Sequence, residues 1–476
     1  MSDQGIQGRA ARGITERIMI QGTLVLETPA NLGNGDAEAL TDMPLLLDEV
    51  SGKPLLTGTS IAGALRAYLR ELEHGYHNAE RLHDRARQLF GAVQDNESVQ
   101  SWVLVDDAQG TAAEIEVRDG VTLDPATRTA VDKGKYDYEL LPAGATFELS
   151  LELLLPEGRE HEALLQSLAL ALQGLEKGEI GLGLRKHRGL GQCRVTEWRV
   201  RRYDLTTAAG LLGWLENDAS GEKTGVAICD LLGVNAAMPD QRKRFTLKAE
   251  FGLAGSLLIR SSGAAGDPDM VHLQSQRGGK PTPILSGTSL AGAIRARALR
   301  IANTMLGESA ARDLIDGMFG HGKTPTEEQP TGSRVLTRET EVTGNLDLVQ
   351  SRVKIDRFTG GAYPQALFSE QPLWGGPESK VIVELELRNP KPAEIGLLLL
   401  VLKDLWTGDL PLGGESSVGR GRLAGRNATL MHYTPQQTRE WILTQGKGDA
   451  LNFSRGKPEE LEAFVAAFLA YKEGQQ

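Results

Sequence analysis

The chain has 476 residues, of which 40% are hydrophobic and 24% are charged, as in globular proteins of several domains. It contains no run of about 18 apolar residues that could span a membrane, and its polar N-terminus does not resemble a secretion signal, so we expect a cytoplasmic protein without a membrane partner. Two cysteines exclude a disulfide framework, and the net charge of −11 means that any nucleic acid must be bound by a local basic stripe.

A repeat is the most informative feature of the sequence. The string LLTGTSIAGALR at residues 55–66 returns as ILSGTSLAGAIR at residues 284–295, with eight of twelve residues identical. LFG at residues 89–91 returns as MFG at the same offset of 229 residues. Two matches in one register indicate a duplicated domain, because solenoid repeats are much shorter.

The first copy begins with an alternating strand near residue 14, followed by a loop and a strand pair that turns at Ser51. A helix follows, capped by Thr59 or Ser60, with an apolar face of the kind that packs on a core. Another strand (147–153), a second helix (161–175) and a glycine-rich turn (181–195) lead to the last strand. The positions expected on the inner face of the first helix are Ile61, Leu65, Tyr68, Leu69 and Leu72.

The second copy repeats this order, with a strand pair (245–260), a helix from Gly287, a strand (381–387), a helix (393–405) and a glycine-rich turn (412–423). Each copy therefore predicts an α+β fold of the ferredoxin-like, RRM-like type. Long middle insertions lie near residues 98–141 and 324–366. The expected divisions are a flexible N-terminus (1–13), a first domain (14–204), a connector (205–243), a second domain (244–430) and a helical C-terminal tail (431–476).

The repeated helix starts combine backbone N–H groups with hydroxyls and an arginine, a combination that suits a phosphate. The glycine-rich turns carry basic residues where the backbone can approach a sugar-phosphate chain. A capped helix and a solvated β-turn remain equally open interpretations. The candidate RNA contacts are Thr59, Ser60, Arg66, Arg185, Lys186 and Arg188 in the first copy, and Thr288, Ser289, Arg295 and Arg420 in the second.

An aspartate followed by methionine precedes each of these helices, Asp42 by 16 residues and Asp269 by 18. A carboxylate beside bound phosphates is unfavourable unless a cation bridges them. These positions therefore suggest phosphodiester chemistry assisted by Mg²⁺ or Mn²⁺, with Asp42 and Asp269 as catalytic and metal-binding candidates. An Asx-turn is the plainer alternative.

Taken together, these motifs resemble the RAMP superfamily, and most closely the fused double backbone (Cas7-type) subunit of type III-D-like CRISPR effector complexes. The motifs are Asp-Met-Pro-Leu at 42–45, the Gly-to-Arg helix starts at 58–66 and 287–295, both Phe-Gly elements, Ile-Asp-Arg-Phe-Thr-Gly-Gly-Ala at 355–362, and the turns at 181–191 and 413–421. The first copy lacks the Ile-Asp-Arg stretch, and the second has Asp269-Met-Val in place of Asp-x-Pro.

The resemblance implies an RRM-like core that holds a CRISPR guide RNA and a thumb-like hairpin, drawn from the middle insertion, that splays the duplex with a complementary target RNA. It also implies contacts from Lys354 and Arg357, other type III effector subunits as partners, and target cleavage by metal-dependent transesterification at Asp42 and Asp269. An unstacked nucleotide lets its 2′-hydroxyl align on the adjacent phosphate, which explains a preference for RNA.

Three other functions remain open. A non-catalytic scaffold would hold guide RNA without cutting. A guide-processing endoribonuclease would need acid–base groups, for which His83 and His187 are the obvious candidates. A nucleotide-dependent enzyme would use the P-loop-like string at residues 317–324 with Lys323, although the preceding segment reads as a helix where a P-loop follows a strand.

Overall fold

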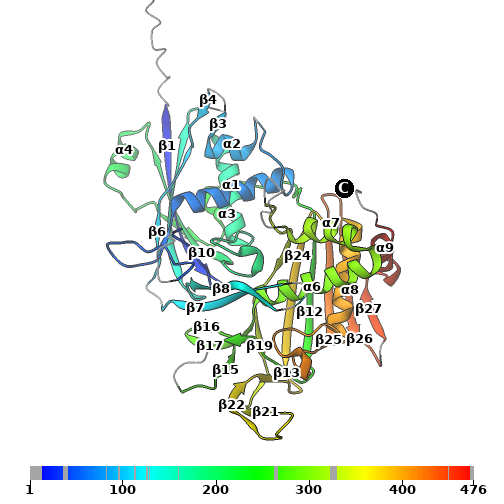
Figure 1. Cartoon of the computed structure of the whole chain (residues 1–476). Helices are drawn as coiled ribbons and strands as arrows, with labels where there is room; N and C mark the ends of the chain where they lie inside the picture. Colours follow the sequence, from blue (N-terminus) through cyan, green and yellow to red (C-terminus); the bar gives the residue numbers. More distant parts are fainter. Residues whose placement is uncertain are drawn as a thin grey trace, which may run out of the picture.

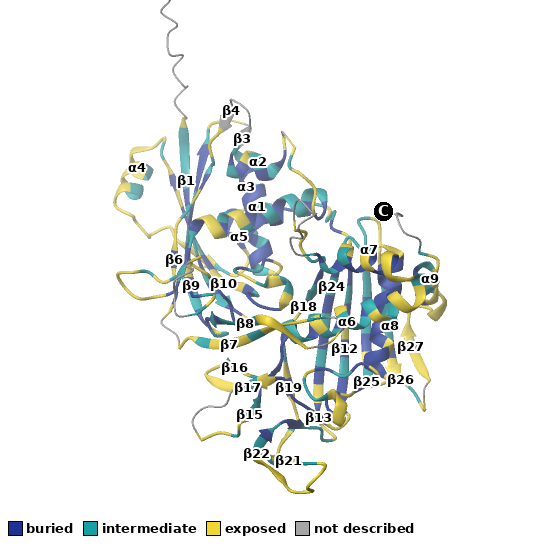
Figure 2. Ribbon diagram, in the orientation of Figure 1, coloured by how far each residue is buried: buried dark blue, intermediate teal, exposed yellow. Residues whose placement is uncertain are grey.

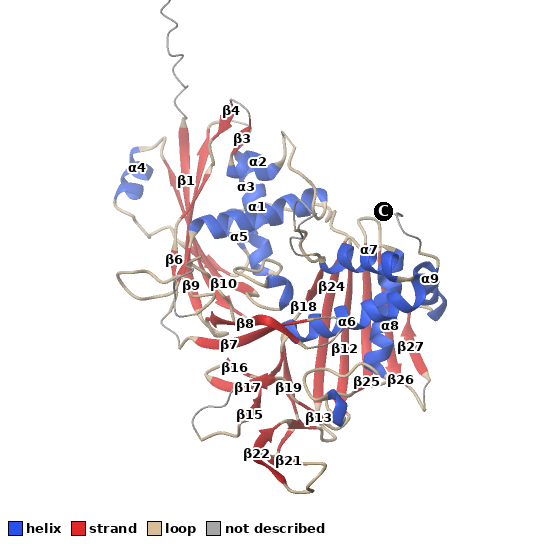
Figure 3. Cartoon of the chain, in the orientation of Figure 1, coloured by secondary structure: helices blue, strands red, loops and turns tan. Residues whose placement is uncertain are grey.

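The computed structural model describes residues 13–35, 41–81, 83–94, 97–111, 114–124, 127, 129–158, 160–261, 266–321, 330–448 and 450–471. It contains two α+β units in tandem, each a sheet covered on one side by helices (Figures 1 and 3). Each unit has its own cluster of buried apolar side chains, one from Ile18 to Ala236 and the other from Phe245 to Phe468. The duplication predicted from the sequence is therefore present as two folded copies.

The first copy is built on an antiparallel sheet with the strand order β11-β10-β1-β9-β5. Its central strand β1 alternates because Ile18, Ile20 and Leu24 point into the core, as period-2 patterning requires. The strands of this sheet are β1 (Ile14–Leu26), β5 (Val103–Val105), β9 (Thr146–Pro156), β10 (Cys193–Asp204) and β11 (Lys223–Gly225). Short strands outside it are β2 (Leu55–Leu56), β3 (Ala92–Gln94), β4 (Glu97–Val99) and β6 (Ala108–Gln109).

The helices of the first copy are α1 (Gly58–His74), α2 (Arg85–Phe90), α3 (Glu160–Glu176), α4 (Ala208–Leu215) and α5 (Ile228–Leu232), with a 3₁₀ turn η1 (Lys186–Arg188). All five residues predicted for the inner face of α1 are buried. Helix α1 begins two or three residues earlier than expected, because Thr57 is the N-cap and its hydroxyl accepts the N–H of Ser60. The caps expected at Thr59 or Ser60 are therefore corrected to Thr57.

The second copy has the same core order, β25-β12-β24 with β18 and β19 both paired to β24. The order last-first-third-second strand is the ferredoxin-like arrangement that the element order predicted. Its main strands are β12 (Arg244–Leu253), β18 (Val335–Thr337), β19 (Thr340–Thr343), β24 (Lys380–Arg388) and β25 (Leu423–Tyr433). The helices are α6 (Gly287–Leu306), α7 (Glu308–Phe319), α8 (Pro392–Trp406) and α9 (Pro458–Leu469), with a 3₁₀ turn η2 (Ser416–Val418).

Smaller strands decorate the second copy. They are β13 (Ser256–Leu257), β14 (Arg260–Ser261), β15 (Met270–His272), β16 (Gln274–Arg277), β17 (Lys280–Leu285), β20 (Leu346–Asp347) and β23 (Leu373–Trp374). Two more, β26 (Thr438–Gln445) and β27 (Leu451–Arg455), extend the sheet beyond β25. The helical tail predicted for residues 431–476 is therefore wrong in its first half, where buried Trp441 on β26 joins the second core, and only α9 is helical.

The segment predicted as a connector is also part of a domain. Strand β11 pairs with β10, and Ile228, Leu231 and Leu232 of α5 are buried in the first core. Apolar residues in a polar-looking segment were sufficient to dock it on the sheet. The first copy thus extends to about residue 236.

Each segment predicted as a middle insertion begins with a strand of the core sheet, β5 in the first copy and β18 in the second, and only its later part forms an antiparallel hairpin that leaves the sheet. This hairpin is in the place of the thumb-like element implied by the resemblance. The first hairpin is β7 (Glu116–Leu123) with β8 (Ala130–Leu140), and the second is β21 (Gln350–Ile355) with β22 (Ala362–Gln371). Figure 2 shows extensive exposure along β21, at the far end of the molecule.

A network of buried charges joins the two copies. The carboxylate of Glu339, in the loop after β18, accepts hydrogen bonds from Arg118 of the first hairpin at 2.6 Å and from Arg277 at 2.8 Å. The side chains of Arg118 and Glu339 are only 2% and 1% exposed. The glycine-rich turn of the first copy packs closely against the start of α6, because a Cβ on Gly287 would lie 2.2 Å from the carbonyl oxygen of Arg188.

Candidate nucleic-acid interface

Asp42 and Asp269 occupy equivalent places in the two copies. Each lies in an exposed loop, and each forms hydrogen bonds with the return strand of its hairpin. The backbone N–H of Asp137 on β8 donates to Asp42 Oδ2 at 2.9 Å, and the N–H of Ser369 on β22 donates to Asp269 Oδ2 at 2.7 Å. The structure therefore brings both predicted aspartates to the base of a projecting hairpin.

The partners of the two aspartates differ in charge. In the first copy the N–H of Asp42 donates in return to the carboxylate of Asp137 at 2.8 Å, so each aspartate holds the backbone of the other. In the second copy the partner is Ser369, whose hydroxyl also donates to Asp269. These bonds from Ser369 hold the pKa of the Asp269 carboxyl below its ordinary value, so it is ionised at neutral pH.

Arginine and aromatic side chains surround the first of these sites. The Arg185 guanidinium lies over the rings of Tyr136 and Tyr138, at 4.5 and 4.7 Å from their centroids, and donates to the Tyr136 hydroxyl. Its other contact is the sulfur of Met43, the residue after Asp42. Arg185 therefore contacts the residue that follows Asp42, while Lys186 and Arg188 on the same turn are exposed. The sequence analysis did not identify Tyr136 or Tyr138. Their spacing of two residues along one strand could have indicated that both rings lie on the same face.

The two helix starts have different environments. Thr59 and Ser60 are exposed at the start of α1, whereas Thr288 and Ser289 at the start of α6 are half-buried because the first copy packs there. The associated arginines, predicted to contact RNA, are engaged in ion pairs. Arg66 donates two hydrogen bonds to the Glu80 carboxylate, through Nε and Nη2. Arg295 binds Asp316 at 3.1 Å. The Glu80 carboxylate raises the pKa of Arg66, and any RNA phosphate would compete with this partner.

Arg420 requires a correction. Its side chain is 3% exposed and binds Glu370 at 2.6 Å and Glu415 at 3.0 Å beneath the second glycine-rich turn. The buried carboxylate of Glu370 and the half-buried one of Glu415 explain this position, because an arginine in the interior needs ionic partners. Arg420 therefore supports the turn and does not contact RNA from this position.

The tip of the second hairpin contains the most exposed aromatic side chain of the described residues. Phe358 is fully exposed, next to the predicted RNA contact Arg357. Asp356 shapes the tip, because its carboxylate accepts the N–H of Phe358 at 2.7 Å. Lys354 lies over the ring of Tyr363 at 4.8 Å and is also exposed. Phe358 was missed in the sequence, although its place between Arg357 and a Gly-Gly turn was a signal.

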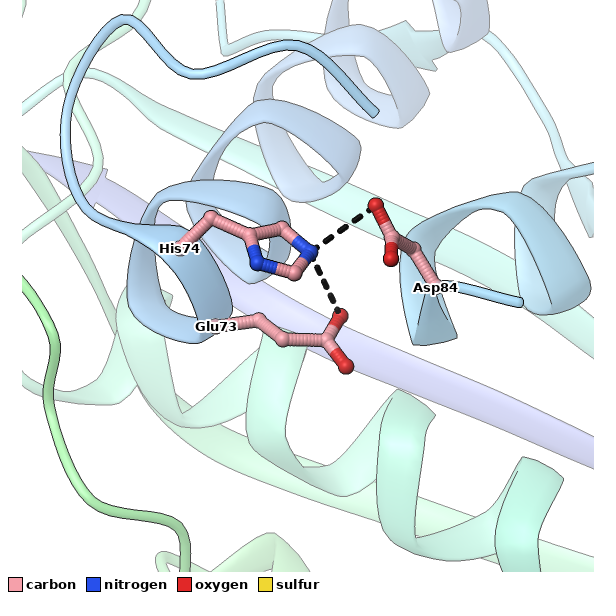
Figure 4. Close-up of side chains that lie close together, drawn as sticks. All are labelled: Glu73, His74 and Asp84. Atoms are coloured by element: carbon pink, nitrogen blue, oxygen red, sulfur yellow. Dashed lines mark ion pairs between the residues drawn. The ribbon is translucent and has the colours of Figure 1, made fainter. Parts of the chain in front are cut away.

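One group of three metal-ligating side chains stands out among the residues that the structure describes. Glu73, His74 and Asp84 gather where α1 meets α2 (Figure 4), with His74 Nε2 2.9 Å from Asp84 and 3.8 Å from Glu73. Both carboxylates also accept backbone N–H groups, from Arg85 and Arg81, which ties α1 to α2. The group joins two helices, and neither predicted aspartate belongs to it.

The paired carboxylates of Asp42 and Asp137 suit a hard divalent cation better than Asp269 and Ser369 do, because Mg²⁺ prefers carboxylate oxygens and keeps several waters. Both aspartates are exposed, so water and a phosphate could complete a coordination shell there.

The P-loop-like string follows helix α7, which ends at Phe319, where a phosphate-binding loop would follow a strand. This confirms that its context is wrong, while Lys323 and Thr324 lie outside the described residues. None of the helices in the described part of the chain is both long and apolar enough to cross a membrane.

The fold and the interface define a tandem pair of ferredoxin-like domains, each with a projecting hairpin that has an aspartate at its base. The sequence pattern of the RAMP superfamily matches residues 23–194 and 257–424, more than half of the chain in two tandem regions. The chain therefore belongs to the RAMP superfamily, and this membership implies a CRISPR-associated RNA-binding subunit. No curated protein matches the chain.

Proposed function

We propose that this chain is the fused double backbone subunit of a type III CRISPR effector complex, and that it cuts target RNA paired to a guide RNA at two sites, Asp42 and Asp269. The observation that carries the proposal is the equivalent placement of these aspartates. Each binds the backbone of the return strand of its own hairpin, although the segments that lead from the two aspartates to the helix glycines Gly58 and Gly287 differ in length by two residues. A duplicated position at the base of a duplex-splaying hairpin is where target cleavage would be repeated at a regular interval.

The residues suit transesterification in the following way. The hairpin unstacks one nucleotide, and the basic residues Arg185 and Lys186 hold the adjacent backbone. The ribose 2′-hydroxyl can then align on its own phosphate, which converts a flexible chain into a positioned reactant. A divalent cation, when bound, would stabilise charge on the phosphate. Asp42 and Asp269 would orient the hydroxyl or hold the cation, each fixed by its bond to the hairpin.

The proposal is tested by cleavage of a labelled complementary RNA with the assembled complex. Asp42→Ala and Asp269→Ala should each remove a different product, and the double variant should remove both, while target affinity changes by less than about twofold. Asp→Asn variants serve as matched controls for structure, because the amide oxygen can still accept the hairpin N–H while the charge is lost. Full cutting by the double variant would reject the site assignment.

The alternative of a non-catalytic scaffold is favoured by one observation, since both carboxylates already serve as clamps for the hairpins. A scaffold would bind target with no product that depends on a divalent metal, so addition of EDTA separates the two functions. The guide-processing alternative has less support. Burial, together with Arg388 and Lys186, lowers the pKa of His187 to about 4, so that His187 is neutral and cannot serve as a general acid at pH 7.

A further inference from the structure

One carboxylate holds the loop that carries Asp42 to its hairpin. The half-buried Glu139, on the return strand β8, accepts a hydrogen bond from the hydroxyl of Thr41 at 3.1 Å through Oε1. Its Oε2 accepts the backbone N–H of Leu45 at 3.0 Å. The backbone N–H of Glu139 also donates to the carbonyl oxygen of Met43 at 3.1 Å. Glu139 therefore binds the loop both before and after Asp42.

A buried amide completes this support. Nδ2 of Asn31 donates to the carbonyl oxygen of Met43 at 3.0 Å and to that of Glu139 at 2.7 Å. Asn31 is only 1% exposed, so its hydrogen bonds are formed out of contact with water, where they are stronger. The amide thus ties the loop to β8 at the residue next to Asp42. We call the side chains of Asn31 and Glu139 the loop anchor.

The second copy holds its aspartate in a different way. The residues after Asp269 form strand β15, in which Met270 pairs with Glu370 and Val271 pairs with Gln371 of the return strand β22. On its other edge β15 pairs with β14. Backbone pairing on both edges therefore fixes the chain directly after Asp269.

A proline explains this difference between the copies. Pro44 stands where the second copy has Val271, since each follows its aspartate by two residues. Proline has no backbone N–H and is disfavoured inside a ladder of paired strands. The side chains of Asn31 and Glu139 therefore supply, in the first copy, a connection to the hairpin that the second copy makes between strands.

The loop anchor is not repeated in the second sequence. Glu139 lies two residues beyond the hairpin residue that binds the aspartate, and the neutral Gln371 lies two residues beyond its counterpart. Asn31 matches Leu258, because the carbonyl oxygen of each accepts an N–H from the glycine-rich turn of its own copy. The side chain of Leu258 cannot form a hydrogen bond. The two sites thus share an aspartate but differ in what supports it.

We propose that Asn31 and Glu139 are positioning residues for the first site, which fix the loop so that Asp42 reaches the target phosphodiester, whereas the site at Asp269 needs no side chain at these positions. The proposal rests on the cleavage function proposed above. Both oxygens of the Glu139 carboxylate bind the loop, so Glu139 acts through Asp42. A displacement of about 1 Å can slow a reaction about 100-fold, so loss of the anchor affects one cut selectively.

The test measures the rates of both cuts in one labelled complementary RNA with the assembled complex. Glu139→Ala should slow the cut assigned to Asp42 at least about tenfold, while the other cut and target binding change by less than about twofold. Asn31→Ala should act in the same direction. Gln371→Ala is the matched control at the equivalent position, and it should leave both cuts unchanged because strand pairing there uses the backbone. An undiminished first cut in Glu139→Ala, or equal slowing of both cuts, would overturn the proposal.

Glu139→Gln separates a positioning role from metal binding. The amide can accept the N–H of Leu45 and donate to the hydroxyl of Thr41, so the anchor is preserved without its charge. The variant should keep at least about half of the first cutting rate, with the same Mg²⁺ concentration for half-maximal cutting. An increase of that concentration by about tenfold would identify Glu139 as a metal ligand and overturn the proposal.

A further measurement reports the loop anchor without any cleavage. Amide hydrogen exchange in the segment 41–46 should be at least about tenfold faster in Glu139→Ala, whereas exchange in the segment 269–272 should be unchanged in Gln371→Ala. Equal exchange of the segment 41–46 in the wild type and Glu139→Ala would overturn the proposal. Failure of the proposed cleavage is seen separately, because Asp42→Ala would then leave the first cut in place.

Discussion

At the residue scale, the two copies provide a natural comparison of one site with two chemistries. The partner of Asp42 is another aspartate, Asp137, whereas the partner of Asp269 is the hydroxyl-bearing Ser369. Two carboxylates attract a divalent cation more strongly than one, and they repel each other when no cation is present. We therefore expect the Mg²⁺ dependence of cutting at Asp42 to differ from that at Asp269.

Asp137→Asn should raise the Mg²⁺ concentration needed for half-maximal cutting at the first site about tenfold, because it removes a charge beside the cation. The cut assigned to Asp269 should keep its Mg²⁺ dependence and serve as an internal reference. The measurement is a Mg²⁺ titration of both products. An unchanged titration at the first site would show that Asp137 acts only as a clamp for the loop.

At the element scale, the hairpins are the parts that we propose to contact the nucleic acid. The second hairpin presents a fully exposed Phe358 with Arg357 beside it at its tip. Aromatic rings stack on bases and cations neutralise phosphates, so this tip suits insertion beside an unstacked nucleotide.

Phe358→Ala should weaken binding of the guide–target duplex about tenfold, since stacking of a base on an aromatic ring contributes about 1–3 kcal/mol. Phe358→Trp is the matched control, because it preserves a ring and should retain affinity. Binding of labelled duplex to the assembled complex measures the effect. Equal affinity of the alanine and tryptophan variants would argue against stacking at this tip.

The strand β15 contains a buried histidine that couples folding to pH. His272 Nδ1 accepts the N–H of Ile259 at 3.2 Å, and its Nε2 lies 2.9 Å from the carbonyl oxygen of Ile284. These contacts fit the neutral ring, and burial lowers the pKa of His272 to about 4. Below about pH 6.5 the unfolded chain binds a proton at His272, whereas the folded chain keeps this ring neutral until the pH approaches 4. The contribution to stability is thus complete above pH 6.5 and is lost as the pH falls toward 4.

We expect His272 to cost the second copy about 1 kcal/mol of unfolding free energy between pH 6.5 and pH 5.5. The measurement is urea unfolding of wild type and His272→Gln at several pH values. The variant should be less stable at pH 7.5 and should lose less stability on acidification. Parallel pH profiles would show that His272 does not titrate as proposed.

At the scale of the whole molecule, buried ion pairs at the junction hold the two copies together. Glu339 receives two arginines, one from each copy, in a place closed to water. A buried ion pair adds little over an apolar contact of the same size, but removing one partner leaves an uncompensated charge. The junction therefore fixes the register between the copies and, with it, the spacing between the two candidate sites.

Glu339→Gln should reduce the free energy of unfolding by about 3 kcal/mol, because Arg118 and Arg277 lose their common partner in the interior. The control variant Glu308→Gln removes an exposed partner of Arg312, and it should change the free energy of unfolding by less than about 0.5 kcal/mol. The free energies of unfolding of the two variants are measured by urea unfolding, monitored by tryptophan fluorescence. If the two variants are equally stable, the junction is not held by this network.

The sequence by itself determined the duplication, because the repeated strings share one offset, and it determined the order of elements and the buried face of α1, because these depend on local periodicity. It also placed Asp42 and Asp269 as equivalent residues. Only the tertiary structure decided that Arg420 is buried, that Arg66 and Arg295 have acidic partners and that the tail adds strands to the second sheet. Those outcomes depend on contacts between residues far apart in the chain, and burial and ion pairing change what a charged side chain can do.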